Sequence, residues 1–496
     1  MKHLSLSILA TLLLTVGHGL SNTFNLIPMT HSWKFRQDGV ALPAAWKTAG
    51  YDDSGWSNGR ALLYVENAAL PAPKNTPLSL INTSGQHTVT YYFRTWFNVT
   101  NPANLTLIST EILDDGAIFY VNGLEVCRRG MITGLSGNLT LAAQAVSDAR
   151  SEGPFYFRCT NLVVGQNLLA VEVHQTSTNS SDVVFGMSLD AAYTTASNLV
   201  LNLSRQGDYV HILSAPSLQP SNEITIEAWV FPIAGSNGFG RFINKGDGDY
   251  VFSQRSYEFT WTRTNVAEFA VYVGTSTALL LSTPMPSNRW SHAAVTYTSS
   301  LGRMGLYTNG VLAAWTTNDT SGTPAAGRKI RQTTLPLVLG GTIGYAETFA
   351  TVLMDEVRIW NQARSGQQIK DTMHSRLSTA PGLMAAWNFD GGDPADVSSQ
   401  LHGGSYFGGS GAVPIAGYDY IHDGASAGPR FSQTLRLDNL WLMRFEAPAG
   451  FDYRIEQSGS LGQWMPDETF TNFSGATWIA RPVLPNNRYY RAVLGQ

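Results

Sequence analysis

Two glutamates on one predicted strand are the first residues whose types suggest chemistry. The run Glu223-Ile-Thr-Ile-Glu227 alternates polar with apolar side chains, as a strand with one buried face does. Glycoside hydrolysis uses two carboxyl groups, about 5–5.5 Å apart in retaining enzymes and about 6.5–9.5 Å apart in inverting ones. Four residues of strand separate Glu223 and Glu227 by about 13–14 Å. This pair is therefore excluded as a catalytic dyad, although a pair from different strands is not. We expect both acids on the solvent side of the strand.

A carboxylate and an imidazole form a second candidate for acid–base work. Glu172 and His174 are separated by one residue, so both leave the same face of a predicted strand. Such a pair can transfer protons, but it is also common as a cross-strand polar cluster. We expect the polar cluster, at the surface of the sheet. The zinc motif His-Glu-x-x-His and the phosphate loop Gly-x-x-x-x-Gly-Lys are both missing from the sequence.

Oxygen-rich loops are candidates for binding calcium. Asn244, Asp247 and Asp249 lie within six residues that also contain two glycines, which permit tight backbone wrapping around a hard cation. The alternative is a plain solvated turn. A second loop of the same character contains Asp390, Asp393 and Asp396.

The chain has two cysteines, Cys127 and Cys159. An exported protein can join them in a disulfide, but their spacing cannot establish one. The alternative is that both are small buried apolar residues. Neither lies in a Cys-x-x-Cys pair, so a zinc site is not expected.

Composition limits the class of protein. The chain has 496 residues, too many for one core, and we expect two to four domains. Charged residues make up only 14% and glycine occurs 47 times, a balance typical of short strands joined by tight turns. A net charge of −4 provides no basic surface, so nucleic acid is not an expected partner.

The N-terminus reads as a targeting segment. Lys2 precedes an apolar run from Leu4 to Val16, and small residues follow it. We therefore predict a signal peptide over residues 1–21 and a secreted or cell-surface protein. The apolar run is too short to cross a bilayer, so no transmembrane segment is expected.

The remaining chain is organised around one strand and one short helix. Val352 to Asn361 alternates with period two, and we expect Asp355 to share the apolar face with Leu353 and Val357. A carboxylate there needs a cation or several N–H donors. Ser365 and Gln368 then have the spacing of a capping box, which predicts the start of a helix.

This region resembles the end of LamG-like jelly-roll domains of the concanavalin-type lectin/glucanase superfamily. The resemblance rests on Met354-Asp-Glu-Val-Arg-Ile-Trp-Asn361 and on three upstream segments in the family's order: Gly207-Asp-Tyr-Val210, Ile224 to Pro232, and Arg289-Trp-Ser-His292 running to Asn309-Gly310. It implies a jelly roll over residues 199–414. Laminarinase-type relatives carry a similar motif whose Asp binds calcium, so the resemblance implies a structural calcium ion at Asp355. The alternative for Asp355 is a set of N–H bonds from a neighbouring loop. The glucanase motif Glu-x-Asp-x-x-Glu is missing here.

Two further modules flank this domain. Residues 28–193 resemble galactose-binding-like β-sandwich modules through Asp114-Asp-Gly116, Tyr120-Val-Asn-Gly123 and Leu169 to Gln175. The Asn122-Gly123 pair also predicts a type I′ hairpin turn. Residues 416–496 resemble a small all-β C-terminal module of exported proteins from verrucomicrobial-type bacteria. The predicted fold class is therefore all-β throughout.

Binding is the function that these observations favour. We expect an exported, non-catalytic protein that binds polysaccharide or a glycosylated surface. Aromatic side chains of the second module offer stacking platforms for sugars: Trp261, Tyr272, Trp290 and Trp315, of which at least two are expected in the core, as is Trp229. The alternatives are an adhesive surface protein that binds other proteins and, third, a laminarinase-type glycoside hydrolase.

Overall fold

The computed structural model describes most of the chain after the N-terminal apolar segment. The described residues are 23–193, 198–233, 239–246, 254–262, 264–274, 277–343, 345, 348–414 and six strands between 430 and 494. The predicted signal peptide, Asp247 and Asp249 lie outside the described residues. In this described part, no helix is both long and apolar enough to cross a membrane. Almost all regular structure is β-strand, which confirms the predicted fold class.

The first module is a β-sandwich. One sheet has the strand order β10-β7-β12-β4-β5, with β1 paired to β12, and the facing strands run β9-β8-β11-β6-β2-β3. Phe93 and Phe185 stack between the two layers with ring centroids 4.1 Å apart. The strands are β1 (Phe24–Ile27), β2 (Ser32–Arg36), β3 (Ser57–Arg60), β4 (Leu63–Val65), β5 (Thr76–Pro77), β6 (Thr90–Val99), β7 (Leu105–Asp114), β8 (Gly116–Val121), β9 (Leu124–Arg129), β10 (Ser151–Phe157), β11 (Gly165–His174) and β12 (Val183–Tyr193).

The second module is a two-layer jelly roll. What we name the β17 sheet has the order β19-β18-β17-β16-β23-β14-β26, and the β24 sheet has the order β22-β21-β20-β15-β24-β13-β27 with β25 beside β24. The elements are β13 (Leu199–Leu203), β14 (Tyr209–Ile212), β15 (Glu223–Pro232), β16 (Phe239–Lys245), β17 (Tyr257–Thr262), β18 (Val266–Val273), β19 (Thr277–Pro284), β20 (Ser291–Thr298), β21 (Arg303–Thr308), β22 (Val311–Thr316), β23 (Leu337–Leu339), β24 (Val352–Trp360), α1 (Gly366–Thr372), β25 (Leu383–Trp387), β26 (Gly404–Phe407) and β27 (Gly411–Pro414).

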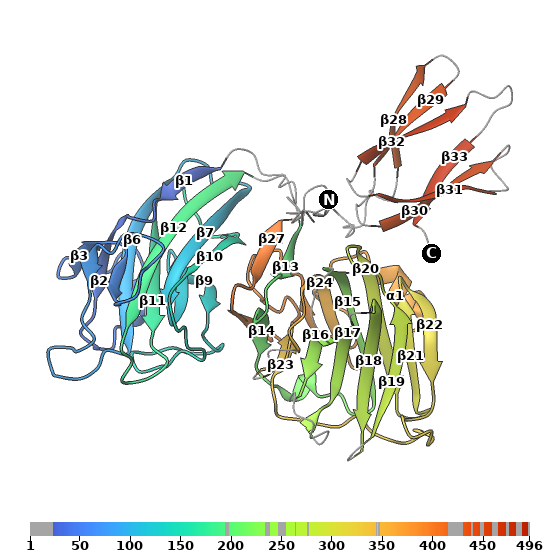
Figure 1. Cartoon of the computed structure of the whole chain (residues 1–496), viewed down its shortest axis with the longest axis horizontal. Helices are drawn as coiled ribbons and strands as arrows, with labels where there is room; N and C mark the ends of the chain where they lie inside the picture. The colour runs from blue at the N-terminus through green and yellow to red at the C-terminus, as the bar shows by residue number, and fades with distance from the viewer. Residues whose placement is uncertain are drawn as a thin grey trace, which may run out of the picture.

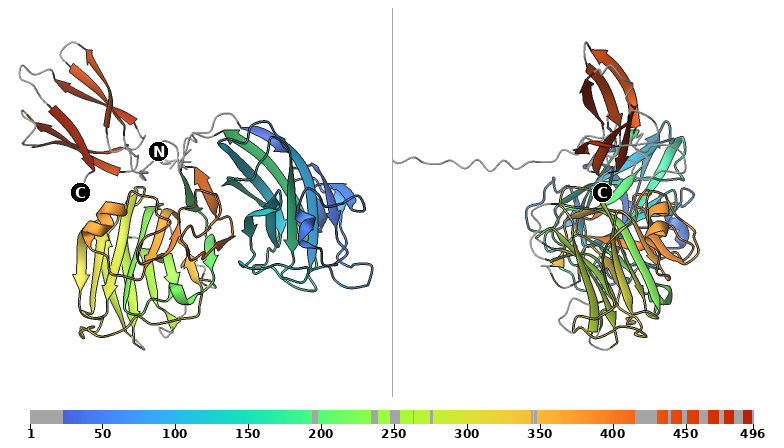
Figure 2. Two further views of the ribbon diagram at one scale, coloured as in Figure 1. Left: turned by 180° about the vertical axis from the view of Figure 1, so that it is seen from behind. Right: turned by 90° about the vertical axis from the view of Figure 1, so that its right-hand side faces the viewer.

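The two modules share a sheet. β26 of the second module pairs with β9 of the first in parallel at Tyr406 and Arg129, so one sheet of 13 strands continues through both. Arg129 lies over the rings of Phe155 and Tyr406 and donates to the carbonyl of Ser410 at 2.8 Å. Figures 1 and 2 show the two sandwiches side by side along this junction.

Local turn and cap signals are confirmed. Asn122 and Gly123 have φ of 48° and 89° between β8 and β9, which are the two positive values of a type I′ turn. Before α1, the Ser365 hydroxyl accepts from the Gln368 N–H and the Gln368 side chain accepts from the Ser365 N–H, forming the predicted capping box.

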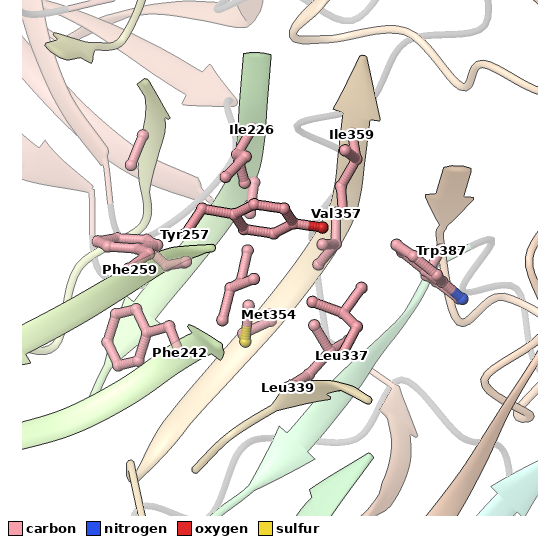
Figure 3. Close-up of a cluster of buried hydrophobic side chains, with 14 of the residues drawn as sticks. Ile226, Phe242, Tyr257, Phe259, Leu337, Leu339, Met354, Val357, Ile359 and Trp387 are labelled. Atoms are coloured by element: carbon pink, nitrogen blue, oxygen red, sulfur yellow. The ribbon is translucent and has the colours of Figure 1, made fainter. Parts of the chain in front are cut away.

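The predicted orientation of Asp355 is wrong, because β24 contains a bulge. Glu227 of β15 pairs with Arg358, but Trp229 pairs with Asp355, so β24 has one extra residue there, and Glu356 has φ of 49°. An extra residue reverses the alternation of side chains beyond it. Met354, Val357 and Ile359 therefore point into the core (Figure 3), whereas Asp355 lies on the opposite side from Met354.

The C-terminal strands form two three-stranded sheets. The orders are β28-β29-β32 and β31-β30-β33. Their bounds are β28 (Arg430–Leu437), β29 (Leu440–Glu446), β30 (Phe451–Ser458), β31 (Met465–Asn472), β32 (Ala476–Pro482) and β33 (Tyr489–Leu494). All the described regular structure of this segment is β-strand, as the all-β prediction requires.

Candidate functional site

The side of the β17 sheet that faces away from the core carries a cluster of polar side chains. Tyr257, Phe259 and Trp261 of β17 point into the core, so alternation turns Glu258 outward between them. On β18 the same alternation turns Glu268 and Tyr272 outward. Glu258 pairs in register with Ala270, and both acids therefore lie on one face of neighbouring strands.

Glu258 is the centre of this cluster. Its carboxylate accepts from the Tyr272 hydroxyl at 2.7 Å and from Arg241 Nε of β16 at 3.2 Å. Arg255 Nη1 lies 3.2 Å from the Tyr272 hydroxyl and 3.9 Å from Glu258. Arg331 lies over the Tyr272 ring, 5.8 Å from its centroid. These planar groups fix one another in defined directions, and the side chains of Arg241 and Glu258 keep 12% and 13% of their surface exposed.

The electrostatics of the cluster distinguish its two acids. Burial raises the pKa of Glu268, and the nearby Glu258 raises it further. Glu258 instead lies between the Arg241 and Arg255 guanidinium groups. Burial, with Glu258 adding to it, also raises the pKa of Tyr272 well above its usual range, so its hydroxyl stays a hydrogen-bond donor.

Most of the aromatic side chains singled out in the second module are buried. Trp229, Trp261, Tyr272 and Trp290 are 3% exposed or less, whereas Trp315 on β22 is 57% exposed. The guanidinium of Arg303 lies over the Trp315 ring at 5.3 Å. Of these five side chains, only Trp315 therefore offers an accessible ring, and it belongs to the other sheet.

The predicted calcium ligand Asn244 is fully buried in β16. Its amide donates to the carbonyl of Gly246 at 3.0 Å and approaches the Thr342 hydroxyl at 3.3 Å. Because Asp247 and Asp249 lie outside the described residues, a calcium site formed by all three stays a prediction.

Asp355 is bound by N–H groups on both oxygens. One accepts from the Asn198 amide at 2.9 Å and the other from the Glu356 N–H at 2.8 Å. The Asn198 carbonyl oxygen in turn faces the Arg376 guanidinium at 3.2 Å, which fixes its amide toward Asp355. These contacts supply the hydrogen bonds of the alternative, and a calcium ion at Asp355 stays a prediction.

The second oxygen-rich loop is also bound internally. Asp396 accepts from the N–H groups of Ala386, Ser398 and His402, and Asp390 accepts from Leu199 N–H and Arg376 Nε. In the described part of the chain, neither these residues nor Asp393 belong to a gathering of three His, Cys, Asp or Glu ligand atoms.

Glu227 is not on the solvent side as predicted. It is 1% exposed and lies beneath the segment that contains α1, whereas Glu223 is half-buried. Glu227 binds Arg364 Nη1 at 2.9 and 3.1 Å and the Trp360 indole N–H at 3.0 Å. The prediction failed because the chain returns over this face of the β24 sheet after β24 ends.

Glu172 and His174 form a polar cluster, but it is buried rather than at the surface. His174 is 0% exposed and lies 3.7 Å from Glu172, which also accepts from the Tyr120 hydroxyl at 2.7 Å. The segment before Thr140 closes over them, because Ser136 donates to Glu172 and the Thr140 carbonyl lies 2.8 Å from His174 Nδ1. An imidazole enclosed in this way has no access to a substrate.

Cys127 and Cys159 are both free in the structure, so of the two alternatives the disulfide is not formed. Cys127 is buried in the core of the first module, and Cys159 packs against it half-buried. Burial raises the pKa of both thiols, that of Cys159 to about 12. Both therefore match the alternative of small buried apolar residues.

Comparison with known families assigns the second module. Residues 204–370 match the family model described as the concanavalin A-like lectin/glucanases superfamily. This part of the chain is therefore a concanavalin-like domain, as its resemblance implied. No curated protein matches the sequence.

Three solved structures illustrate what this chain is similar to. A protein described as carbohydrate binding from Bacteroides ovatus is 13% identical, with 67% of this chain and 94% of that chain covered and a TM-score of 0.36. An SAP-like pentraxin from Limulus polyphemus is 12% identical over 35% of this chain and 81% of its own, with a TM-score of 0.28. The CBM40 module of the Ruminococcus gnavus IT-sialidase is 14% identical over 36% and 98%, with a TM-score of 0.27.

Sequence reasoning missed Arg241, Arg255, Glu258 and Glu268. The available signal was alternation, because Tyr257-Glu258-Phe259-Thr260-Trp261 turns its polar residues to one face. Which polar residues meet depends on strand register, which a single sequence does not specify.

Proposed function

We propose that the protein is an exported, non-catalytic binding protein that holds carbohydrate on the β17 sheet of its concanavalin-like domain. The observation that carries this proposal is the cluster of Arg241, Glu258 and Tyr272 on the face opposite the core. The lectin/glucanase superfamily assignment of residues 204–370 supports it. Export is proposed from the predicted signal peptide.

The chemistry of the cluster suits sugar hydroxyls. A hydroxyl group donates one hydrogen bond and accepts others, and planar carboxylate and guanidinium groups satisfy both needs with fixed geometry. Arg241 is already oriented by Glu258 and by the Thr342 hydroxyl at 2.8 Å, so binding costs little ordering of its side chain.

Retention of the full chain on insoluble polysaccharides tests the proposal. We expect soluble sugar to release the bound protein, and Arg241→Ala to weaken retention about 10-fold or more, since a hydrogen bond to a charged group contributes about 1.5–3 kcal/mol. Arg303→Ala is the matched control, because it removes an arginine from the other sheet. Because Arg303 lies over the Trp315 ring, retention reduced by Arg303→Ala alone would instead indicate that the sugar binds at Trp315.

Loss of retention counts only in a variant that melts like the wild type. Retention that no soluble sugar reverses, together with capture on glycan-free protein surfaces, would favour the alternative of an adhesive protein.

A second candidate, glycoside hydrolysis, is favoured by one observation. Glu258 and Glu268 lie diagonally on neighbouring strands of the same face, and burial raises the pKa of Glu268, as a general acid requires. Diagonal cross-strand neighbours lie about 7–8 Å apart, within the range of a carboxyl pair around a glycosidic bond. Reducing-sugar release from β-glucans that Glu268→Gln abolishes would replace the binding proposal with this one.

A further inference from the structure

Three acidic side chains of the first module meet at the ends of neighbouring strands in the sheet that contains β12. Glu66 follows β4, Asp114 ends β7, and Asp182 precedes β12. One carboxylate oxygen from each lies within 4.8 Å of the other two. We name these residues the acidic cluster. None of them has a role in the carbohydrate-binding proposal.

Strand register explains why they meet. β12 lies between β4 and β7, with Val184 opposite both Tyr64 and Asp114. Continuing the antiparallel register by two residues puts Asp182 opposite Glu66. All three side chains therefore leave the same face of the sheet, although they are far apart in the sequence.

Asp114 lacks the partners that a buried carboxylate requires. It is 0% exposed, and neither of its oxygens has a hydrogen-bond partner. In the described part of the chain, no Lys, Arg or His nitrogen lies within 4.0 Å of any of the three carboxylates. Burial raises the pKa of Asp114 to about 8, with Asp115, Asp182 and Glu66 adding to the effect. Glu66 accepts from the Ala68 N–H at 2.6 Å and Asp182 from the Ser180 hydroxyl at 3.3 Å, but three acids in this space still repel one another when ionised.

Asp115, the residue next to Asp114, does have hydrogen-bond partners. Asp115 accepts from Val146 N–H at 2.7 Å and from the N–H and hydroxyl of Thr176 at 2.8 and 2.9 Å. The chain therefore supplies N–H donors to one of two adjacent carboxylates and none to the other. Asp114 is instead directed at two further acids.

The geometry points to a divalent cation of the calcium type, bound by Glu66, Asp114 and Asp182. Calcium takes oxygen ligands at about 2.3–2.6 Å, so ligands on opposite sides of one ion lie about 5 Å apart. The separations within the acidic cluster fit this arrangement. The buried Gln175 side chain lies beside the cluster, because its amide donates to the Asp182 carbonyl at 2.7 Å, and its oxygen has no hydrogen-bond partner among the described residues.

The test is melting of the full chain after EDTA treatment, with and without CaCl₂, together with calorimetric titration of the metal alone. We expect a rise of about 5–10 °C in the transition of the first module at 100-fold excess over the dissociation constant. Asp114→Asn should abolish the calcium response. In EDTA, this variant should melt at or above the wild-type temperature, because a neutral amide at any pH does not repel Glu66 and Asp182.

Two further variants keep the test decisive. Glu66→Gln changes a half-buried ligand and should also abolish the response if Asp114→Asn fails to fold. Asp355→Asn removes the acid that the family resemblance assigned to calcium, and it should leave the response intact. The inference is overturned if CaCl₂ leaves wild-type melting unchanged, if the response survives in Glu66→Gln, or if Asp355→Asn alone abolishes it.

Discussion

The two sandwich modules hold buried acids in opposite ways. In the first module, the acidic cluster combines three carboxylates with no cationic side chain within ion-pairing distance among the described residues. In the concanavalin-like domain, Glu227 and Glu356 lie with Arg358 and Arg364 beneath α1, in what we name the paired cluster. Both groups lie on the face of their sheet that points away from the main core, so burial alone does not explain the difference.

The paired cluster is compensated by its own chain. Arg358 binds Glu356 and lies 3.5 Å from Glu227, and it also donates to the Thr372 carbonyl at 3.0 Å. Burial by itself lowers the pKa of Arg358, but Glu356 and Glu227 raise it above its ordinary value. The charges of the two acids and two arginines cancel. This cluster therefore needs nothing from solution, whereas the acidic cluster needs a counter-ion.

The largest expected effect comes from breaking the paired cluster. Glu227→Gln leaves Arg358 and Arg364 buried with one acid between them, and removing one partner of a buried ion pair costs about 3–5 kcal/mol. We expect the unfolding free energy of the concanavalin-like domain to fall by this amount in urea denaturation. CaCl₂ should not restore it.

Glu223→Gln is the matched control on the same strand. Glu223 is half-buried and, among the described residues, accepts from the Thr298 hydroxyl and the Ala363 N–H, so we expect a loss below about 1 kcal/mol. Equal losses in the two variants would show that the paired cluster contributes no more than a half-buried acid does.

Local signals were sufficient to predict parts of the fold. The Ser365 cap and the Asn122-Gly123 turn depend on residues within four positions of one another, and both formed as predicted. The bulge at Glu356 was not predictable, because its φ of 49° follows from pairing with β15, more than a hundred residues away. That one inserted residue is why the predicted face of Asp355 was wrong.

A smaller effect is expected at Asp355, beside the paired cluster. Asp355→Asn keeps one acceptor but turns an N–H₂ group toward either the Asn198 amide or the Glu356 N–H. A lost bond to a buried charged acceptor costs about 1–3 kcal/mol. We expect this loss of unfolding free energy to be the same in EDTA and in CaCl₂. A loss confined to CaCl₂ would restore the metal prediction at this residue.

The candidate sites were harder to predict than the fold for the same physical reason. Glu66, Asp114 and Asp182 come from three strands, and only the pairing of β12 with both β4 and β7 brings them together. Glu258 and Arg241 likewise meet across β16 and β17. Tyr272 was noticed as an aromatic residue, yet its contribution is its hydroxyl, since its ring is buried.

The smallest expected effect separates the two clusters by their response to salt. Glu66 and Asp182 are half-buried, so mobile ions approach them, whereas the acids of the paired cluster are at most 2% exposed. Raising ionic strength from about 0.01 to 1 M shortens the screening length from about 30 to 3 Å, which weakens repulsion between accessible like charges. In EDTA at about pH 9, above the pKa of about 8 of Asp114, the wild type should therefore gain about 0.2–1 kcal/mol relative to Asp114→Asn as NaCl is added. Taking the difference between two variants cancels the general effect of salt on folding. A difference that stays constant across the NaCl series would mean that the acidic cluster carries less charge than its three carboxylates imply. The two modules would then differ in the protonation of their buried acids, and not in whether a cation compensates them.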